Sequence, residues 1–196
     1  MRERSDPIVT TSSITLEEKQ PESVSAPGGY RYGRAMTHPE PLITRRRSVS
    51  PDWIDYNGHM NVGYYGVAFD KATDGLLDLL GLGEAYRHDS NASMFIVEAH
   101  MTYDREVSEG APLRFETQVL DADEKRLHMF HAMYHETEGY LAATNELMGL
   151  HVDLNLRRSA PFPDVARNKI QTMVREHEKL ERPRQIGRVI GIRRGS

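Results

Sequence analysis

The sequence contains no cysteine, which excludes a thiol nucleophile, a structural disulfide and any metal site built on thiolate ligands. Long apolar runs are also missing, because the most hydrophobic stretch, residues 76–82, is interrupted by Asp78 and Gly81. The first thirty residues contain glutamates and no continuous apolar segment, so they are not typical of a secretory signal. We therefore expect a cytoplasmic protein with no membrane partner.

Positive and negative side chains are nearly equal in number. The formal net charge is −4, the isoelectric point is about 6.1, and 38% of the 196 residues are hydrophobic. A nucleic-acid-binding domain usually carries a strongly basic face, so this balance predicts no nucleic-acid partner. The length suits one compact domain with polar ends rather than two domains.

Composition divides the chain into three parts. Residues 1–38 are rich in Ser, Thr, Pro, Gly and charge, which predicts an arm that is flexible or lies on the surface. Residues 39–162 carry the periodic apolar patterns of a folded domain. After two prolines, residues 163–196 are expected to form a polar C-terminal helix and then a basic tail.

Apolar periodicity predicts one long buried helix among strands. The helix is expected to begin after Asn61 as N-cap and to stop at Gly81 or Gly83, with a wide apolar stripe. Alternating or apolar segments predict strands over residues 42–49, 93–103, 112–120, 126–137 and 140–152. The fold class is therefore α+β, with one helix wrapped by an antiparallel sheet whose last four strands are expected to form a meander.

The loop before this helix carries the residues most suited to chemistry. Residues 55–61 read Asp-Tyr-Asn-Gly-His-Met-Asn, and Tyr65 and Phe69 follow on the helix. This segment resembles the signature of hotdog-fold thioesterases, which include the 4-hydroxybenzoyl-CoA thioesterase group and the plant acyl-carrier-protein thioesterases. Within that superfamily, residues 51–61, 122–128 and 150–153 most resemble the betainyl-CoA thioesterases of carnitine breakdown.

The resemblance implies hydrolysis of a small acyl-CoA thioester, with coenzyme A as part of the substrate and no separate cofactor. Asp55 would act as nucleophile or as general base toward water, and Gly58 with the amides after it would stabilise the oxyanion. By likeness to the plant enzymes, Asn57 would polarise the carbonyl or hold the water, and His59 would orient Asp55 or the loop. The alternative is that these residues simply form a turn before the helix.

Further side chains near this motif are candidates for the site. Glu98, in an otherwise apolar strand, is a second-acid candidate, and an edge carboxylate paired with an arginine is the alternative. Trp53, Tyr56, Asn61 and Tyr65 are candidates for substrate contact. Aromatic faces attract a trimethylammonium group by about 0.5–2 kcal/mol per contact. Such contacts would suit a betainyl group, and ordinary core packing is the alternative.

The histidines at 128, 131 and 135 invite a metal interpretation that fails on geometry. On a strand, His131 and His135 share a face but lie about 13 Å apart, while His128 points to the opposite face. One ion with bonds of about 2.1 Å cannot bridge that separation. We therefore predict no metal.

Arg126, Arg157 and Arg158 are weak candidates for contacts with the CoA phosphates, and a solvated basic end is the alternative. The family resemblance also implies self-association into a dimer or tetramer, with sites at the interface. Two other functions stay open: a non-catalytic acyl-CoA-binding protein of the same fold, and a hotdog dehydratase acting on a hydroxyacyl thioester.

Overall fold

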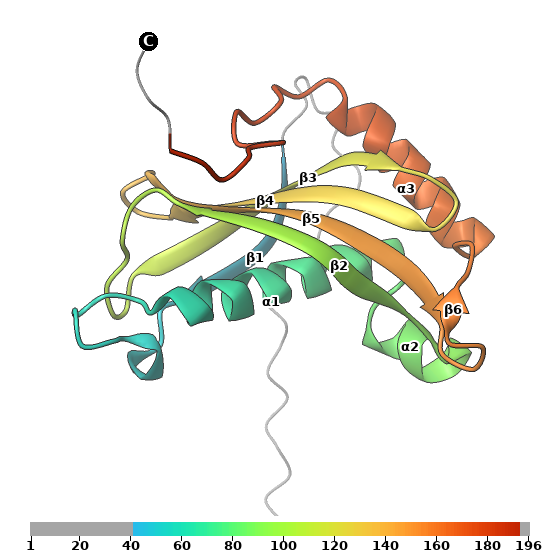
Figure 1. Ribbon diagram of the computed structural model, residues 1–196, viewed down its shortest axis with the longest axis horizontal. Helices are drawn as coiled ribbons and strands as arrows, with labels where there is room; N and C mark the ends of the chain where they lie inside the picture. Colours follow the sequence, from blue (N-terminus) through green and yellow to red (C-terminus); the bar gives the residue numbers. More distant parts are fainter. Residues whose placement is uncertain (1–40, 193–196) are drawn as a thin grey trace, which may run out of the picture. The chain divides into compact units, whose positions relative to one another are not determined.

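A computed structural model describes residues 41–192, so the arm predicted over residues 1–38 lies outside the described residues. The elements, in chain order, are β1 (Leu42–Ser48), a short 3-10 turn (Pro51–Trp53), α1 (Val62–Leu80), α2 (Glu84–Ser90), β2 (Ala92–Tyr103), β3 (Pro112–Ala122), β4 (Arg126–His135), β5 (Leu141–Asp153), β6 (Arg158–Ser159) and α3 (Asp164–His177). The sheet curls over α1 on one face, and the segment after α3 lies over the other face (Figure 1).

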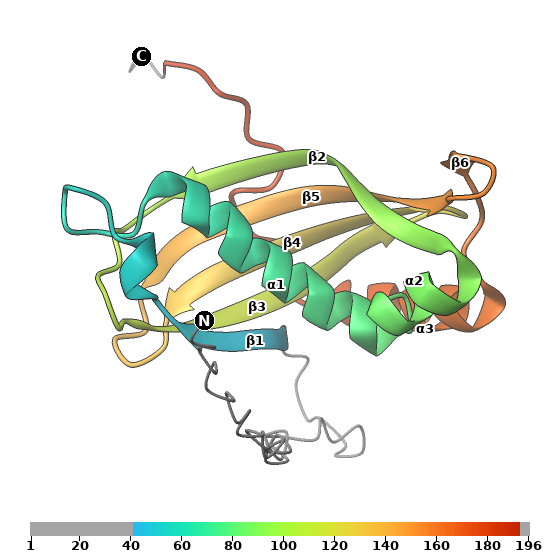
Figure 2. The same cartoon turned by 90° about the horizontal axis from the view of Figure 1, so that it is seen from below.

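The central helix forms where its capping residues predict. The Asn61 side chain accepts a hydrogen bond from Gly63 N at 2.9 Å, and Gly81 ends the helix in the left-handed conformation with φ of 77°. One side of α1 is buried along its whole length, by Tyr65, Ala68, Phe69, Ala72, Thr73, Leu76 and Leu80. The helix therefore lies across the concave face of the sheet (Figure 2).

The sheet has the strand order β1-β3-β4-β5-β2, with β6 paired to the end of β5. Short links make β3–β4 and β4–β5 antiparallel hairpins, as predicted. The prediction of a four-stranded meander was wrong in one respect, because β2 pairs with β5 and not with β3. Residues 104–111 between β2 and β3 are too many for a tight hairpin, and the near edge of β3 is taken by β1.

Two small elements were not predicted. The segment that forms α2 was expected to be a loop. The helix has no buried residue and no side-chain cap at Gly83. Strand β6 is only two residues long and follows Arg157, which has a positive φ of 49°. Neither segment carries an apolar period, so sequence patterns could not reveal them.

Helix α3 completes the core beside β3. Strand β1 pairs with β3 only as far as Thr117, and the backbone N–H of Val119 beyond it donates to His177 Nδ1 at 2.8 Å. Ile170 and Met173 of α3 are buried with the C-terminal half of α1. No helix within residues 41–192 is both long and apolar enough to cross a membrane.

Candidate active site

The loop that precedes α1 is a small closed hairpin. Ile54 and Met60 form an antiparallel bridge, and inside it Asp55 N donates to His59 O at 3.0 Å. Gly58 N donates to Asp55 O at 3.0 Å, and Gly58 has a φ of 81°, which side-chain-bearing residues rarely adopt. The turn thus holds Asp55 at its base, while the residues at its tip project into solvent.

The Asp55 carboxylate is held at one oxygen. Oδ1 accepts a hydrogen bond from Asn57 N at 2.8 Å, and the side chain is half-buried. Within residues 41–192 the second oxygen accepts no hydrogen bond. A carboxylate fixed through one oxygen presents the other to a substrate or a water molecule.

The backbone amides of the loop differ in availability. The amides of Gly58, Met60 and Asn61 already donate to Asp55 O, Val107 O and Trp53 O. Among the described residues, the amides of His59 and of Val62 have no backbone acceptor. The Tyr56 amide, in the same turn as His59, has no acceptor within residues 41–192 either. The Val62 amide is free because the first amides of a helix lack intrahelical partners. Gly58 contributes its conformation rather than a free amide.

The aromatic residues around the loop play different structural parts. Trp53 is buried, with Tyr64 stacked against it at 5.5 Å between ring centroids and the Arg47 guanidinium 3.9 Å from its ring. Tyr56 is 97% exposed at the tip of the hairpin. Tyr65 is buried and meets the Tyr103 ring edge to face at 5.2 Å. The Asn61 side chain caps the helix, where it accepts the hydrogen bond from Gly63 N.

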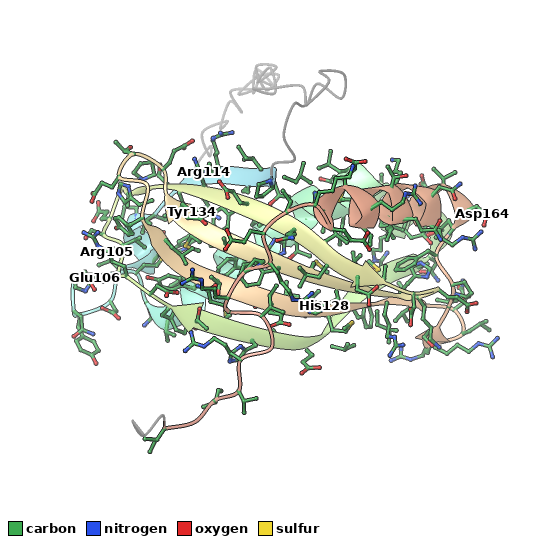
Figure 3. All side chains as sticks on the ribbon, turned by 90° about the horizontal axis from the view of Figure 1, so that it is seen from above. Arg105, Glu106, Arg114, His128, Tyr134 and Asp164 are labelled. Carbon is green, nitrogen blue, oxygen red and sulfur yellow. The ribbon has the colours of Figure 1, made fainter. Side chains whose placement is uncertain are left out.

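A cluster of tyrosines and one acid lies beside this loop. Burial raises the pKa of Tyr65, and the neighbouring Tyr140, Glu106 and Tyr103 raise it further, against a hydrogen bond with the Val107 backbone that lowers it. The Tyr140 hydroxyl donates to Glu106 O at 3.1 Å. Figure 3 shows Glu106 at the end of the sheet where the hairpin loop lies.

The other predicted site residues lie away from Asp55 within this chain. Glu98 is exposed in the middle of β2, opposite Met148 at a bulge, and forms no ion pair with another described residue. Arg126 is held by Asp123 in its own turn, with Nε 2.7 Å from Oδ2. Hydrogen bonds from Lys125 N and from the Arg126 side chain lower the pKa of Asp123 to about 2.

Arg157 and Arg158 are exposed next to β6 and α2, at the opposite end of the sheet from the loop (Figure 1). One chain therefore does not bring these two arginines to Asp55.

The three histidines of β4 point to different surroundings. His131 is fully buried, between the hydroxyls of Thr73 and Thr117. His128 Nε2 lies 2.8 Å from Glu146 Oε1 on the other face of the sheet. His135 accepts a hydrogen bond from a turn amide and packs on an aromatic ring.

A curled antiparallel sheet around one long helix, with an acid in the loop before that helix, defines the hotdog thioesterase class. The chain belongs to the Thioesterase-like superfamily, whose sequence profile matches residues 49–170. This confirms the α+β hotdog prediction.

Relatives of known name agree with this assignment. A betainyl-CoA thioesterase of Pseudomonas aeruginosa is 40% identical over 151 residues, which cover 77% of this chain and 95% of the relative. An L-carnitine dehydrogenase/betainyl-CoA thioesterase of Rhizobium meliloti is 35% identical over 154 residues, which cover 79% of this chain but only 31% of that longer protein.

Solved structures of similar proteins agree with the hotdog assignment. A protein from Staphylococcus aureus, determined in complex with CoA, has a TM-score of 0.74 and 28% identity, with 82% of this chain and 99% of the other covered. A putative thioesterase from Pseudomonas putida has a TM-score of 0.69 and 37% identity, with 79% and 98% covered. The protein is therefore a thioester hydrolase, and acyl-CoA thioesters are its substrate class.

Two residues of the site could not be predicted from the sequence. Tyr103 and Glu106 lie near the hairpin only because β2 pairs with β5 and its last residue then meets α1. No spacing along the chain signals that contact. The free amide of Val62, in contrast, is among the amides after Gly58 that the sequence predicted as oxyanion donors, because the cap at Asn61 sets the helix start.

Proposed function

We propose that this protein hydrolyses betainyl-CoA to betaine and CoA, with Asp55 as the catalytic carboxylate. The observation that carries the proposal is the Asp55 side chain in the loop before α1, fixed through one oxygen by Asn57 N and free at the other. The similarity to two proteins named for betainyl-CoA thioesterase activity supports the acyl group. The similarity to a structure in complex with CoA supports the thiol portion.

Asp55 acts on the thioester carbonyl by one of two routes. As general base, its free oxygen takes a proton from water, the water oxygen bonds to the carbonyl carbon, the C–S bond breaks, and the proton passes to the CoA sulfur. As nucleophile, it bonds to the carbonyl carbon and expels CoA, and water then cleaves the resulting anhydride. An intact-mass measurement after a rapid quench separates the routes, since only the second adds the acyl mass to the protein.

The remaining loop residues support this chemistry. In this proposal the free amides of His59 and Val62 donate to the oxyanion, and such direct donors are typically worth about 2.7–4 kcal/mol of barrier. The Asn57 side chain, exposed at the tip, orients the carbonyl or the water. Gly58 allows the turn, and the His59 carbonyl fixes the Asp55 backbone.

We further propose a homodimer, alone or paired into a tetramer, that forms through the outer edge of β2. This strand ends the sheet, and its Phe95, Ile96 and Val97 are exposed, as are Val62 and Val67 of α1. An edge strand with exposed apolar side chains is a site for pairing with another chain.

The dimer supplies what one chain lacks. Strand β2 begins near α2 and β6 and ends near the hairpin loop (Figure 2). Antiparallel pairing of two β2 strands therefore sets the α2–β6 end of the partner subunit beside Asp55. Arg157 and Arg158 of the partner subunit then lie where the CoA phosphates of this site extend. Cytoplasmic location stays a prediction.

Release of free thiol tests the function directly. Betainyl-CoA, acetyl-CoA, a hydroxyacyl-CoA and 4-hydroxybenzoyl-CoA are each mixed with the protein, and thiol release is followed with a thiol-reactive dye. We expect the highest kcat/KM for betainyl-CoA. Binding without thiol release from any of the four would favour the acyl-CoA-binding alternative. Loss of water from the hydroxyacyl-CoA, with no thiol release, would favour the dehydratase.

A further inference from the structure

We propose that the exposed face of Tyr103, together with the Glu106 carboxylate, binds the quaternary ammonium group of a cationic acyl chain. This inference rests on the proposed function, because it names the residues that would select a betainyl group over a neutral one. A methylated ammonium ion is attracted to the face of an aromatic ring and to a carboxylate, and a neutral group of the same shape gains neither interaction.

Other aromatic faces near the hairpin loop are already covered by the protein itself. The Trp53 ring has Tyr64 stacked at 5.5 Å and the Arg47 guanidinium 3.9 Å from its ring centroid. The Tyr140 ring carries the Arg105 guanidinium at 3.9 Å. A bound cation would have to displace these arginines, so neither ring offers a free face of the kind that a substrate cation needs.

Tyr103 differs from these rings because a neighbouring ring fixes its orientation while one of its faces stays exposed to solvent. Its ring meets buried Tyr65 edge to face at 5.2 Å, which fixes its orientation against the first turns of α1. It is nevertheless 48% exposed, and within residues 41–192 no arginine or lysine lies over it. Tyr56, at 97% exposed, has an open ring too, but it lies at the hairpin tip, where no other ring of residues 41–192 packs against it.

Negative charge follows the open ring along the chain, since Glu106 is three residues after Tyr103. Glu106 is exposed, and it contributes to the raised pKa of Tyr65, the residue that supports Tyr103. Arg105 forms no ion pair with it within residues 41–192, and this arginine lies over the Tyr140 ring and 3.8 Å from Glu138. A cation between ring and carboxylate would gain from both.

The cluster is tied to the loop that carries Asp55. Met60 N donates to Val107 O at 2.9 Å, which joins the hairpin to the segment that holds Glu106. In a betainyl thioester only one methylene group separates the ammonium nitrogen from the reacting carbonyl. The cation site therefore has to lie close to the catalytic carboxylate, and the Met60–Val107 bond ties the segment of Glu106 to the hairpin that carries Asp55.

A matched pair of substrates tests this assignment. Betainyl-CoA and tert-butylacetyl-CoA have the same shape, and they differ in a charged nitrogen against a neutral carbon. We expect Tyr103→Leu and Glu106→Gln each to lower kcat/KM for betainyl-CoA by about tenfold and to leave that for the neutral substrate within about twofold. Tyr103→Phe keeps the ring face and should keep the preference for betainyl-CoA.

Control variants and a binding measurement complete the test. Glu109→Gln changes an exposed acid of the same link, and Tyr134→Leu changes a tyrosine already covered by Arg114, so neither should alter the ratio of the two kcat/KM values. An unchanged ratio in both Tyr103→Leu and Glu106→Gln would overturn the inference. If the wild type hydrolyses neither thioester, the proposed function fails. Calorimetric affinities of the same variants for the two thioesters then decide on the cation site.

Discussion

Thr73 Oγ1 lies 3.0 Å from His131 Nε2, and this contact joins the middle of α1 to β4 inside the core. The Thr73 hydroxyl donates to Phe69 O, so it accepts from the imidazole, and His131 Nδ1 then accepts from Thr117 at 2.7 Å. Thr117 in turn lies 2.8 Å from the Thr44 hydroxyl. A neutral imidazole thus links α1, β4, β3 and β1, with both ring nitrogens paired.

The buried imidazole makes stability depend on pH. Burial lowers the pKa of His131 from 6.5 to about 3, so the folded protein keeps it neutral where the unfolded chain would bind a proton. The stabilisation is complete above pH 6.5 and falls by about 1.4 kcal/mol per pH unit as the pH drops toward 3. Urea unfolding between pH 7 and 4 should show a shallower pH slope for His131→Gln than for wild type. The exposed control His88→Gln should keep the wild-type slope, and equal slopes in all three would contradict this account.

A second histidine anchors the C-terminal helix. His177 Nδ1 accepts from Val119 N at 2.8 Å, and burial lowers the pKa of His177, which keeps that nitrogen free to accept. His177→Ala leaves a buried backbone donor unpaired, so we expect a loss of about 1–3 kcal/mol in the free energy of unfolding. Glu178→Ala, at an exposed neighbour, should cost far less in the same denaturation experiment. Equal losses for the two variants would show that the bond does not anchor α3.

A glycine sets the distance between α1 and β1. A Cβ at Gly75 would lie 2.3 Å from Thr44 O, a backbone atom that cannot move without shifting the strand. Gly75→Ala should therefore lower the melting temperature, by an overpacking cost of about 1–3 kcal/mol. Gly66→Ala is the matched control in the same helix, because its Cβ would come no closer than 4.0 Å to a neighbour. Equal or higher melting of Gly75→Ala relative to Gly66→Ala would refute the close approach.

Local signals predicted α1 and the hairpins because each depends on residues adjacent in sequence. Asn61 and Gly81 mark the helix ends through their own backbone and side-chain chemistry, and the short links fix β3–β4 and β4–β5. The position of β2 depends instead on pairing with β5, some fifty residues away in the chain. For that reason the motif around Asp55 was evident from the sequence, whereas Tyr103 was not.

The proposed dimer depends on the apolar edge of β2. Val97→Asp places a charge among exposed Phe95 and Ile96, which should shift the protein to monomers in light scattering coupled to size-exclusion chromatography. Thiol release should fall with the dimer, because the partner supplies part of the site. Val165→Asp alters an even more exposed valine, on α3, and should leave the mass unchanged. A Val97→Asp protein that keeps the wild-type mass would contradict an interface at this edge.

The role of Asp55 is tested most directly by kcat/KM for betainyl-CoA in Asp55→Asn, measured by thiol release beside Asp52→Asn. The asparagine keeps the size of the side chain and its bond from Asn57 N but removes the negative charge. We predict a loss of at least about 100-fold for Asp55→Asn, with circular dichroism and melting temperature unchanged. Asp52→Asn, an exposed acid of the same loop, should retain wild-type activity. Wild-type activity in Asp55→Asn would contradict the central assignment.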